Sequence, residues 1–113
     1  MDDAQSLKRL SDNRFDAVVI NMALMDIPNH KSTFESCYRI LKAKGMFVFS
    51  ILHPCFESPF SSDDPPLELT SSGDFVACRV NRYLEEGHWQ SGGTGVRGRV
   101  GAYHRTISTY IMI

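Results

Sequence analysis

The sequence lacks an apolar run long enough to cross a membrane, and it carries almost no net charge. A membrane-spanning helix requires about 18 or more consecutive apolar residues, and no such run occurs among the 113 residues. The formal net charge is −1, so no strong field favours nucleic acid or an anionic lipid surface. We therefore expect neither a nucleic-acid partner nor a membrane partner.

Cysteine is also scarce, and the N-terminus has none of the features of a secretory signal. The three cysteines are an odd number, which does not form a complete disulfide framework. The first residues, Met1, Asp2 and Asp3, supply neither a basic start nor an apolar core. These features predict a cytoplasmic location. No metal site is predicted, because the histidine and cysteine spacings match no tight zinc motif.

The clearest positive signal is a pair of continuous apolar runs, 15–20 and 46–52, on either side of a helical pattern. Continuous runs rich in Val, Ile and Phe favour strands that are buried on both faces in a parallel sheet. The helical pattern places four apolar residues at i, i+3, i+4 and i+7, on one face: Phe34, Cys37, Tyr38 and Leu41. The sequence therefore predicts a β-α-β unit in an α/β fold, with Cys37 buried.

Both ends of this helix have sequence signals. Ser32 and Glu35 have the spacing of a capping box at the start. Lys42 and Lys44 are expected in the last turn, where cations favour the negative end of the helix dipole. Gly45 is expected to follow as the left-handed residue that ends the helix.

Polar residues follow both apolar runs, at 21–26 and at 52–55. In open α/β sheets, ligands bind outside the carboxyl ends of parallel strands, so these segments are the candidate binding edge. An alternative remains open, because Asn and Asp often only satisfy the backbone of a turn.

Four ordered segments, 3–4, 12–27, 38–45 and 50–54, together resemble the C-terminal part of a class I S-adenosylmethionine-dependent methyltransferase of the small-molecule type. In that family an Asp-Asn-x-Phe-Asp phrase opens the fourth strand, and an Arg-apolar-Leu-Lys phrase closes the next helix. The resemblance implies a partial Rossmann-like fold, whose parallel β-α-β core is extended by antiparallel strands. It also implies methyl transfer from S-adenosylmethionine to a small-molecule acceptor.

The resemblance implies two groups of cofactor-binding residues. The Asp3 carboxylate would accept from the adenine amino group, and the Ala4 backbone amide would face the ring. Asn21, Met22 and Ala23 would lie along the methionine part and the sulfonium. The alternative for Asp3 is an acidic, frayed terminus.

The resemblance also implies a substrate side. His53 is a candidate for contacting the substrate or removing its proton, since an imidazole can accept a proton near neutral pH; the alternative is a loop residue that bonds the backbone. For Met25, which the resemblance also implies on this side, the alternative is that it is an ordinary core residue. An Arg can hold a substrate carboxylate in a two-pronged contact. The further residues implied on this side are Met25, Asp26, Tyr103, His104 and Arg105.

The family's glycine-rich cofactor loop would precede Met1. We therefore expect a partial methyltransferase domain over residues 1–113, with weak cofactor affinity. A competing hypothesis is a catalytically inactive, truncated domain that forms a homodimer through an open sheet edge, where unpaired backbone groups invite another strand.

Within that domain we expect the β-α-β core at 1–56, a flexible loop at 57–73 and a strand-rich segment at 74–113. The Gly93-x-Gly95-x-x-Gly98 pattern predicts a hairpin loop, because it lacks the preceding strand and following helix of a dinucleotide site. The last segment predicts a strand and then a helix start that Ser108 or Thr109 would cap.

Overall fold

The computed structural model describes residues 1–55, 67–78, 80, 82–90 and 94–112. These fall into two compact units that divide between Ile51 and Leu52.

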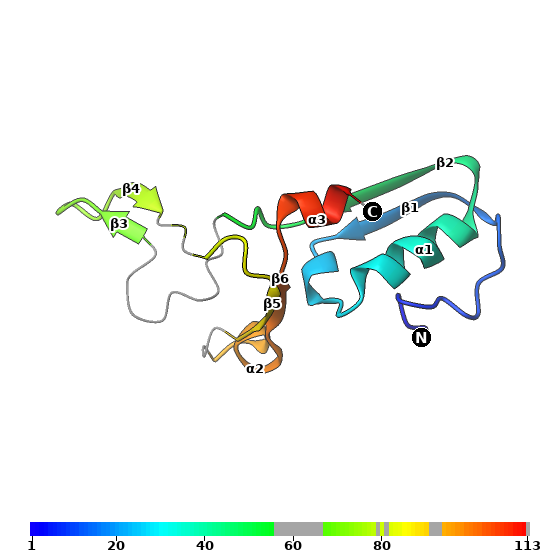
Figure 1. Cartoon of the computed structure of the whole chain (residues 1–113), viewed down its shortest axis with the longest axis horizontal. Helices are drawn as coiled ribbons and strands as arrows, with labels where there is room; N and C mark the ends of the chain where they lie inside the picture. The colour runs from blue at the N-terminus through cyan, green and yellow to red at the C-terminus, as the bar shows by residue number, and fades with distance from the viewer. Residues whose placement is uncertain (56–66, 79, 81, 91–93, 113) are drawn as a thin grey trace. The chain divides into compact units, whose positions relative to one another are not determined.

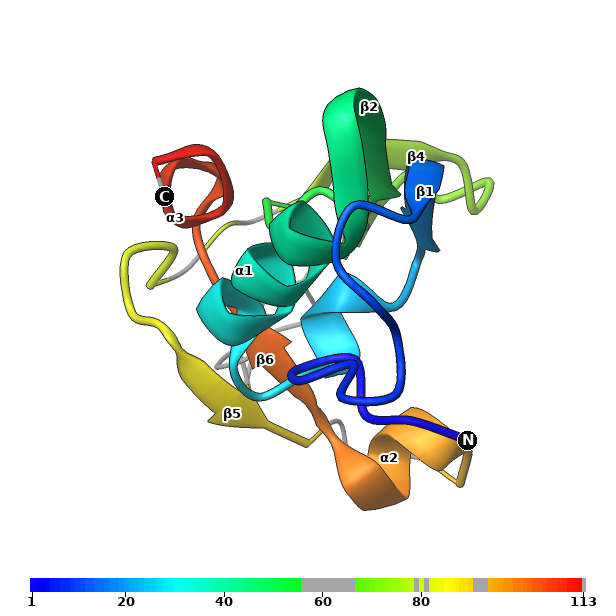
Figure 2. The same ribbon diagram turned by 90° about the vertical axis from the view of Figure 1, so that its right-hand side faces the viewer.

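The first unit is a β-α-β unit, as predicted. Its two strands pair in parallel, with matched partners from Ala17 opposite Met46 to Asn21 opposite Ser50. One helix lies against one face of the pair (Figure 1 and Figure 2). The elements in chain order are β1 (Phe15–Asn21), the 3-10 helix η1 (Leu24–Asp26), α1 (His30–Ile40) and β2 (Leu41–Ser50).

Aromatic side chains join the helix to the sheet. The Phe34 ring of α1 meets Phe47 edge-on, with ring centroids 5.2 Å apart, and meets Phe49 at 5.7 Å. Such edge-to-face pairs contribute about 0.5–1.5 kcal/mol beyond the area they bury. Because Phe47 and Phe49 are two residues apart in β2, both point to the same face of the sheet. This face is the core of the unit.

The buried stripe of α1 differs from the predicted one. Cys37 and Ile40 are each 3% exposed and Thr33 is fully buried, so the predicted burial of Cys37 is confirmed. Tyr38, which was expected on the apolar face, is 84% exposed. The stripe follows i, i+4 and i+7 from Thr33, and this register turns Tyr38 to the outside.

The opposite face of the sheet is open in the part of the chain that the structure describes. Val19 is 66% exposed, Met46 60% and Val48 43%. The expectation of strands buried on both faces is therefore wrong for the described residues, in which a helix covers only one face.

The predicted ends of α1 are wrong at both sides. Asn29, not Ser32, caps the start, and its side chain accepts from the Ser32 backbone N–H at 3.0 Å. Asn is among the strongest N-caps, so it takes the role one turn earlier. The helix ends at Ile40 because Leu41 already pairs with Phe15 of β1.

The two lysines therefore lie in β2 rather than in the last turn of α1. Between the first and second matched pairs, β2 advances five residues while β1 advances two, so β2 bulges over this stretch. The left-handed residue of the bulge is Lys44, with φ +68°, and not Gly45 as predicted. At Gly45 a Cβ atom would lie 2.9 Å from the Lys42 carbonyl oxygen, so glycine is needed there for close approach.

The second unit contains antiparallel strand pairs. The pairs are separate two-stranded sheets among the described residues, rather than additions to the β1–β2 sheet. The predicted α/β class is confirmed by the parallel strand pair. The elements are β3 (Leu67–Leu69) with β4 (Phe75–Cys78), β5 (Gly87–Trp89) with β6 (Ala102–His104), and the short helices α2 (Val96–Val100) and α3 (Ile107–Ile111).

Three local predictions for this unit need correction. The predicted loop contains a strand, β3, at its end, while residues 56–66 lie outside the described part. The glycine-rich stretch does connect two hairpin strands, but its described part forms the helical turn α2. Thr106, not Ser108 or Thr109, caps α3, and its side chain accepts from the Thr109 N–H at 3.2 Å.

Candidate functional site

The carboxyl ends of β1 and β2 are joined by one hydroxyl group. Ser50, the last residue of β2, donates from Oγ to Asn21 Oδ1 at 2.6 Å. The Met22 backbone N–H donates to the Ser50 carbonyl oxygen at 3.0 Å and lies 3.1 Å from Ser50 Oγ. Sequence reasoning named Asn21 and Met22 but missed Ser50. The available signal was that Ser50 is a polar residue inside the apolar run 46–52.

The backbone reverses direction immediately after this junction. Met22 has φ +53° and is 41% exposed. Ala23 is exposed and precedes η1, and Asp26 is exposed with its N–H donating to the Ala23 carbonyl at 3.0 Å. Met25 is 5% exposed, which agrees with the alternative in which it is a core residue. The exit loop therefore presents Met22, Ala23 and Asp26 to the outside.

The N-terminal segment is fixed to the start of α1 by Gln5. Its Oε1 accepts from the Asn29 N–H at 3.0 Å, and its carbonyl accepts from Ser36 Oγ at 3.0 Å. The Asp3 carboxylate accepts from the Gln5 N–H at 2.9 Å, and Ala4 is half-buried. Because α1 starts where the chain returns from the carboxyl end of β1, Asp3 and Ala4 lie at the same end of the helix as the candidate edge.

Arg39 holds the remainder of the N-terminal segment. Its guanidinium donates to the carbonyls of Leu10 and Leu7, each at 2.9 Å, and of Ser6 at 3.2 Å. It also forms an ion pair with Asp12. Sequence reasoning used Arg39 only as part of a family phrase, because its partners lie about 30 positions away and no local pattern links them.

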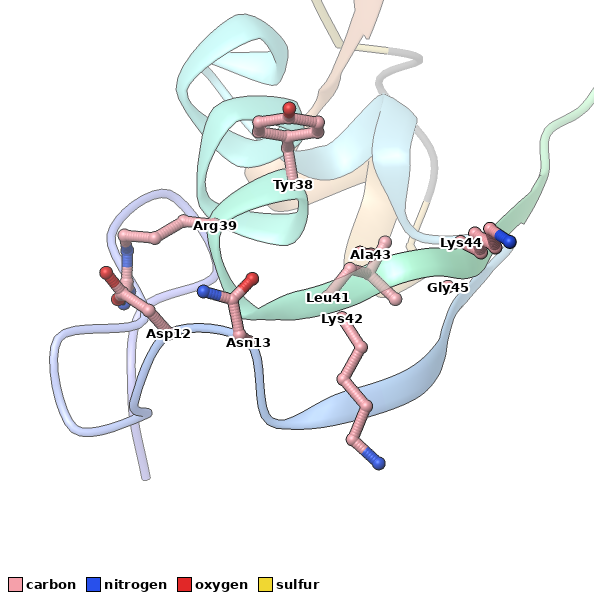
Figure 3. Close-up of a pocket in the computed structure, with 9 residues that line it drawn as sticks. All are labelled: Asp12, Asn13, Tyr38, Arg39, Leu41, Lys42, Ala43, Lys44 and Gly45. Atoms are coloured by element: carbon pink, nitrogen blue, oxygen red, sulfur yellow. The ribbon is translucent and has the colours of Figure 1, made fainter.

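A surface hollow lies at the other end of the unit, where α1 ends and β2 begins (Figure 3). It is separated from the strand-end junction by the length of β2, so it is not part of the candidate edge. Its lining residues are Asp12, Asn13, Tyr38, Arg39, Leu41, Lys42, Ala43, Lys44 and Gly45.

Comparison with known proteins identifies the fold and a family match over the first 49 residues. The profile of the methyltransferase domain family matches residues 1–49. A protein from Listeria monocytogenes, assigned as an S-adenosylmethionine-dependent methyltransferase, superposes with a TM-score of 0.76 at 27% identity, covering 98% of this chain and 49% of its own. An S-adenosylmethionine-dependent methyltransferase from Mesorhizobium loti gives a TM-score of 0.78 at 26% identity, with 98% and 48% covered. The chain has the fold of these S-adenosylmethionine-dependent methyltransferases, which confirms the predicted partial Rossmann-like fold, and its residues 1–49 match the methyltransferase domain family.

The chain spans about half the length of these two methyltransferase structures. No curated protein gives a significant match.

In the second unit, two of the residues predicted on the substrate side, Tyr103 and Arg105, belong to an aromatic cluster. The Arg105 guanidinium lies 5.0 Å from the centre of the Tyr103 ring and 5.9 Å from that of Tyr110. Arg105 is 6% exposed. The ring of Tyr103 also contacts His88, with centroids 5.0 Å apart. Cation–π contacts of this kind stabilise a buried guanidinium.

His104 is likewise buried, at 5% exposure. Its Nε2 lies 2.9 Å from the Tyr83 carbonyl oxygen, and its ring meets that of Tyr83 edge-on at 5.9 Å. His53 is exposed, and its Nδ1 accepts from the Cys55 backbone N–H at 3.2 Å. The structure thus places Tyr103, His104 and Arg105 together, and it places His53 in a turn of the same unit.

Glu86 is a further charged residue that accepts hydrogen bonds within the second unit. Its carboxylate accepts from the Thr106 N–H at 2.8 Å and from the Thr109 hydroxyl. Burial alone would raise the pKa of Glu86, but the hydrogen bonds from Thr109 and Thr106, together with the charge of Arg105, outweigh burial and lower the pKa. Glu86 therefore anchors the first turn of α3.

Among the described residues, no three or more His, Cys, Asp or Glu side chains gather into a group that could hold a metal ion. None of the helices that the described residues form has the length and apolar character needed to span a membrane.

Proposed function

We propose that this chain supplies part of the cofactor edge of a methyltransferase that transfers a methyl group from S-adenosylmethionine to a small-molecule acceptor. The observation that carries the proposal is the junction of Asn21, Met22 and Ser50. It lies at the carboxyl edge of a parallel strand pair, which is where α/β folds bind ligands, in a chain with the methyltransferase fold.

The residues at this edge fit the cofactor chemically. Asn21, Met22 and Ala23 carry no charge, so they do not repel a sulfonium, and the Asn21 amide and the exposed backbone offer polar contacts to the methionine part. The Asp3 carboxylate has two acceptor oxygens, and a charged acceptor strengthens a hydrogen bond from the adenine amino group. These residues would hold the cofactor along its adenine and sulfonium parts.

The chain's contribution to the reaction would be binding and orientation. The bound cofactor supplies the electrophilic methyl group. Holding the acceptor atom in line with that group lowers the entropic part of the barrier. The His53 imidazole is exposed and would remove the acceptor's proton where the acceptor needs deprotonation. By resemblance, the half-buried Tyr103 would face the acceptor, whereas His104 and Arg105, which the resemblance also implies there, are buried.

Calorimetric titration of the purified chain with S-adenosylmethionine tests the proposal. We expect measurable binding, weakened about tenfold by Asp3→Asn and by Asn21→Ala, since each removes one polar contact worth about 1–1.5 kcal/mol. Glu35→Gln is the matched control, because Glu35 is an exposed carboxylate on α1. The absence of binding at millimolar cofactor would overturn the proposal for this chain.

A second candidate function is a non-catalytic module that pairs with a second copy of itself. The open sheet face with Val19, Met46 and Val48 supports it, as does the pairing of β1 with β2 alone among the described strands. Sedimentation should then show a dimer that Val19→Lys dissociates, because the change buries an unpaired charge in the contact. A monomer at all concentrations would exclude this candidate.

We also propose a cytoplasmic location. The Cys37 thiol, which forms no disulfide, supports it, because thiols persist in reducing compartments. Trapping the thiols in intact cells would test it, since oxidised cysteines would contradict the proposal.

A further inference from the structure

We infer that Ser50 is a positioning residue that sets the conformation of the cofactor-facing loop, an inference that rests on the function proposed above. Ser50 does not face the cofactor in this account. It acts through Asn21 and Met22, the two residues whose groups its hydroxyl and carbonyl engage.

The backbone of Met22 is what requires such support. Its φ of +53° lies in the left-handed region, which costs a residue with a Cβ atom about 1–2 kcal/mol. Methionine has no side-chain group that would offset this cost by bonding its own backbone. The Met22 N–H instead donates to the Ser50 carbonyl at 3.0 Å, with Ser50 Oγ at 3.1 Å. The parallel neighbour strand therefore supplies the interaction that holds the turn.

The same hydroxyl orients the Asn21 amide. Because Ser50 Oγ donates to Asn21 Oδ1 at 2.6 Å, the amide oxygen is occupied and the NH₂ group is directed away from Ser50. Asn21 then presents a donor rather than an acceptor to a ligand at the edge. One side chain thus fixes both the direction of the Asn21 amide and the reversal at Met22.

The arrangement predicts a specific set of variants. Ser50→Ala removes the hydroxyl, while Ser50→Thr keeps a hydroxyl on the same atom and suits a strand. Met22→Asn places a residue that tolerates the left-handed region at the strained position. If Ser50 acts by holding Met22, Met22→Asn should offset the loss caused by Ser50→Ala.

The test has one arm without a ligand and one with S-adenosylmethionine. In the nuclear magnetic resonance spectrum of the full chain, a strong nuclear Overhauser effect between the amide and α protons of residue 22 reports positive φ. We expect this signal in the wild type, in Ser50→Thr and in Ser50→Ala/Met22→Asn, and its loss in Ser50→Ala. Cofactor affinity should fall about tenfold in Ser50→Ala and be retained in Ser50→Thr, whereas Ser50→Ala/Met22→Asn changes a cofactor-facing residue and is used only for the signal of residue 22.

The two arms separate this inference from the proposed function. A wild type that does not bind S-adenosylmethionine overturns the proposed function, and the signal of residue 22 still decides the role of Ser50. If Ser50→Ala retains the signal of residue 22, the positioning role is wrong, whatever the affinity. If the wild type binds, and Ser50→Ala loses the signal of residue 22 but keeps the cofactor affinity of the wild type, the link to the cofactor is wrong.

Discussion

Replacing Arg39 should release the N-terminal segment that carries the proposed adenine contact. Its guanidinium donates to three backbone carbonyls, those of Ser6, Leu7 and Leu10, and pairs with Asp12. At about 1 kcal/mol net for each hydrogen bond, the three carbonyl contacts contribute about 3 kcal/mol against opening of the segment. The ion pair with Asp12 is largely exposed, at 34% and 64%, and adds about 0–1 kcal/mol.

Native-state hydrogen exchange measures this opening directly. The Leu7 N–H donates to the Asp3 carbonyl and the Leu10 N–H to the Leu7 carbonyl, so both amides report the segment. Arg39→Ala should lower their protection by about 3 kcal/mol. Arg39→Lys should recover only about a third, because one ammonium replaces a planar fork of donors. Asp12→Asn is the control, and an effect of Arg39→Ala no larger than that of Asp12→Asn would refute the reasoning.

Three further predictions concern the bulge of β2, the anchor of α3 and the cysteines. Gly45→Ala should destabilise the chain by about 1–3 kcal/mol in urea unfolding, because backbone atoms occupy the space of the new Cβ. Lys44→Gly should stabilise the chain by up to about 1 kcal/mol, because it relieves a positive φ. Equal effects of the two variants would contradict the bulge. Because the pKa of Glu86 is lowered in the folded state, its stabilising contribution is present above its ordinary pKa of 4.5 and is lost as the pH falls below that value. Glu86→Gln should therefore make the stability of α3 depend less on pH in the acid range. An unchanged acid profile would count against the anchor. Thiol labelling should modify Cys55 before Cys37, since burial raises the pKa of the Cys37 thiol and blocks access; simultaneous labelling would argue against the buried face of α1.

The parallel β-α-β unit was predictable because its signals are local. The apolar runs and the helical spacing between them indicate strand, helix and strand without any tertiary information. The predicted ends of the helix were wrong because two adequate caps compete within four residues, and Asn29 wins over Ser32. Strand pairing at Leu41 then ends the helix before Gly45, a tertiary effect that no propensity contains.

The candidate edge was predictable only in part, for a related reason. Asn21 and Met22 follow an apolar run, so their place at a strand end can be read from the chain. The bond to Ser50 depends on the register of β1 against β2, which pairs residues 29 positions apart. The anchoring of the N-terminal segment by Arg39 and Gln5 is non-local in the same way. Sequence patterns predict the helices and strands, whereas the contacts between them depend on how the strands are paired.

The most direct test of the central claim is a nuclear magnetic resonance titration of the chain with S-adenosylhomocysteine, the product form of the cofactor. The account predicts that amide shifts concentrate at residues 3–5 and 21–23, at the carboxyl edge of the parallel pair. Shifts confined to the hollow at residues 38–45, or no shifts at millimolar ligand, would contradict it.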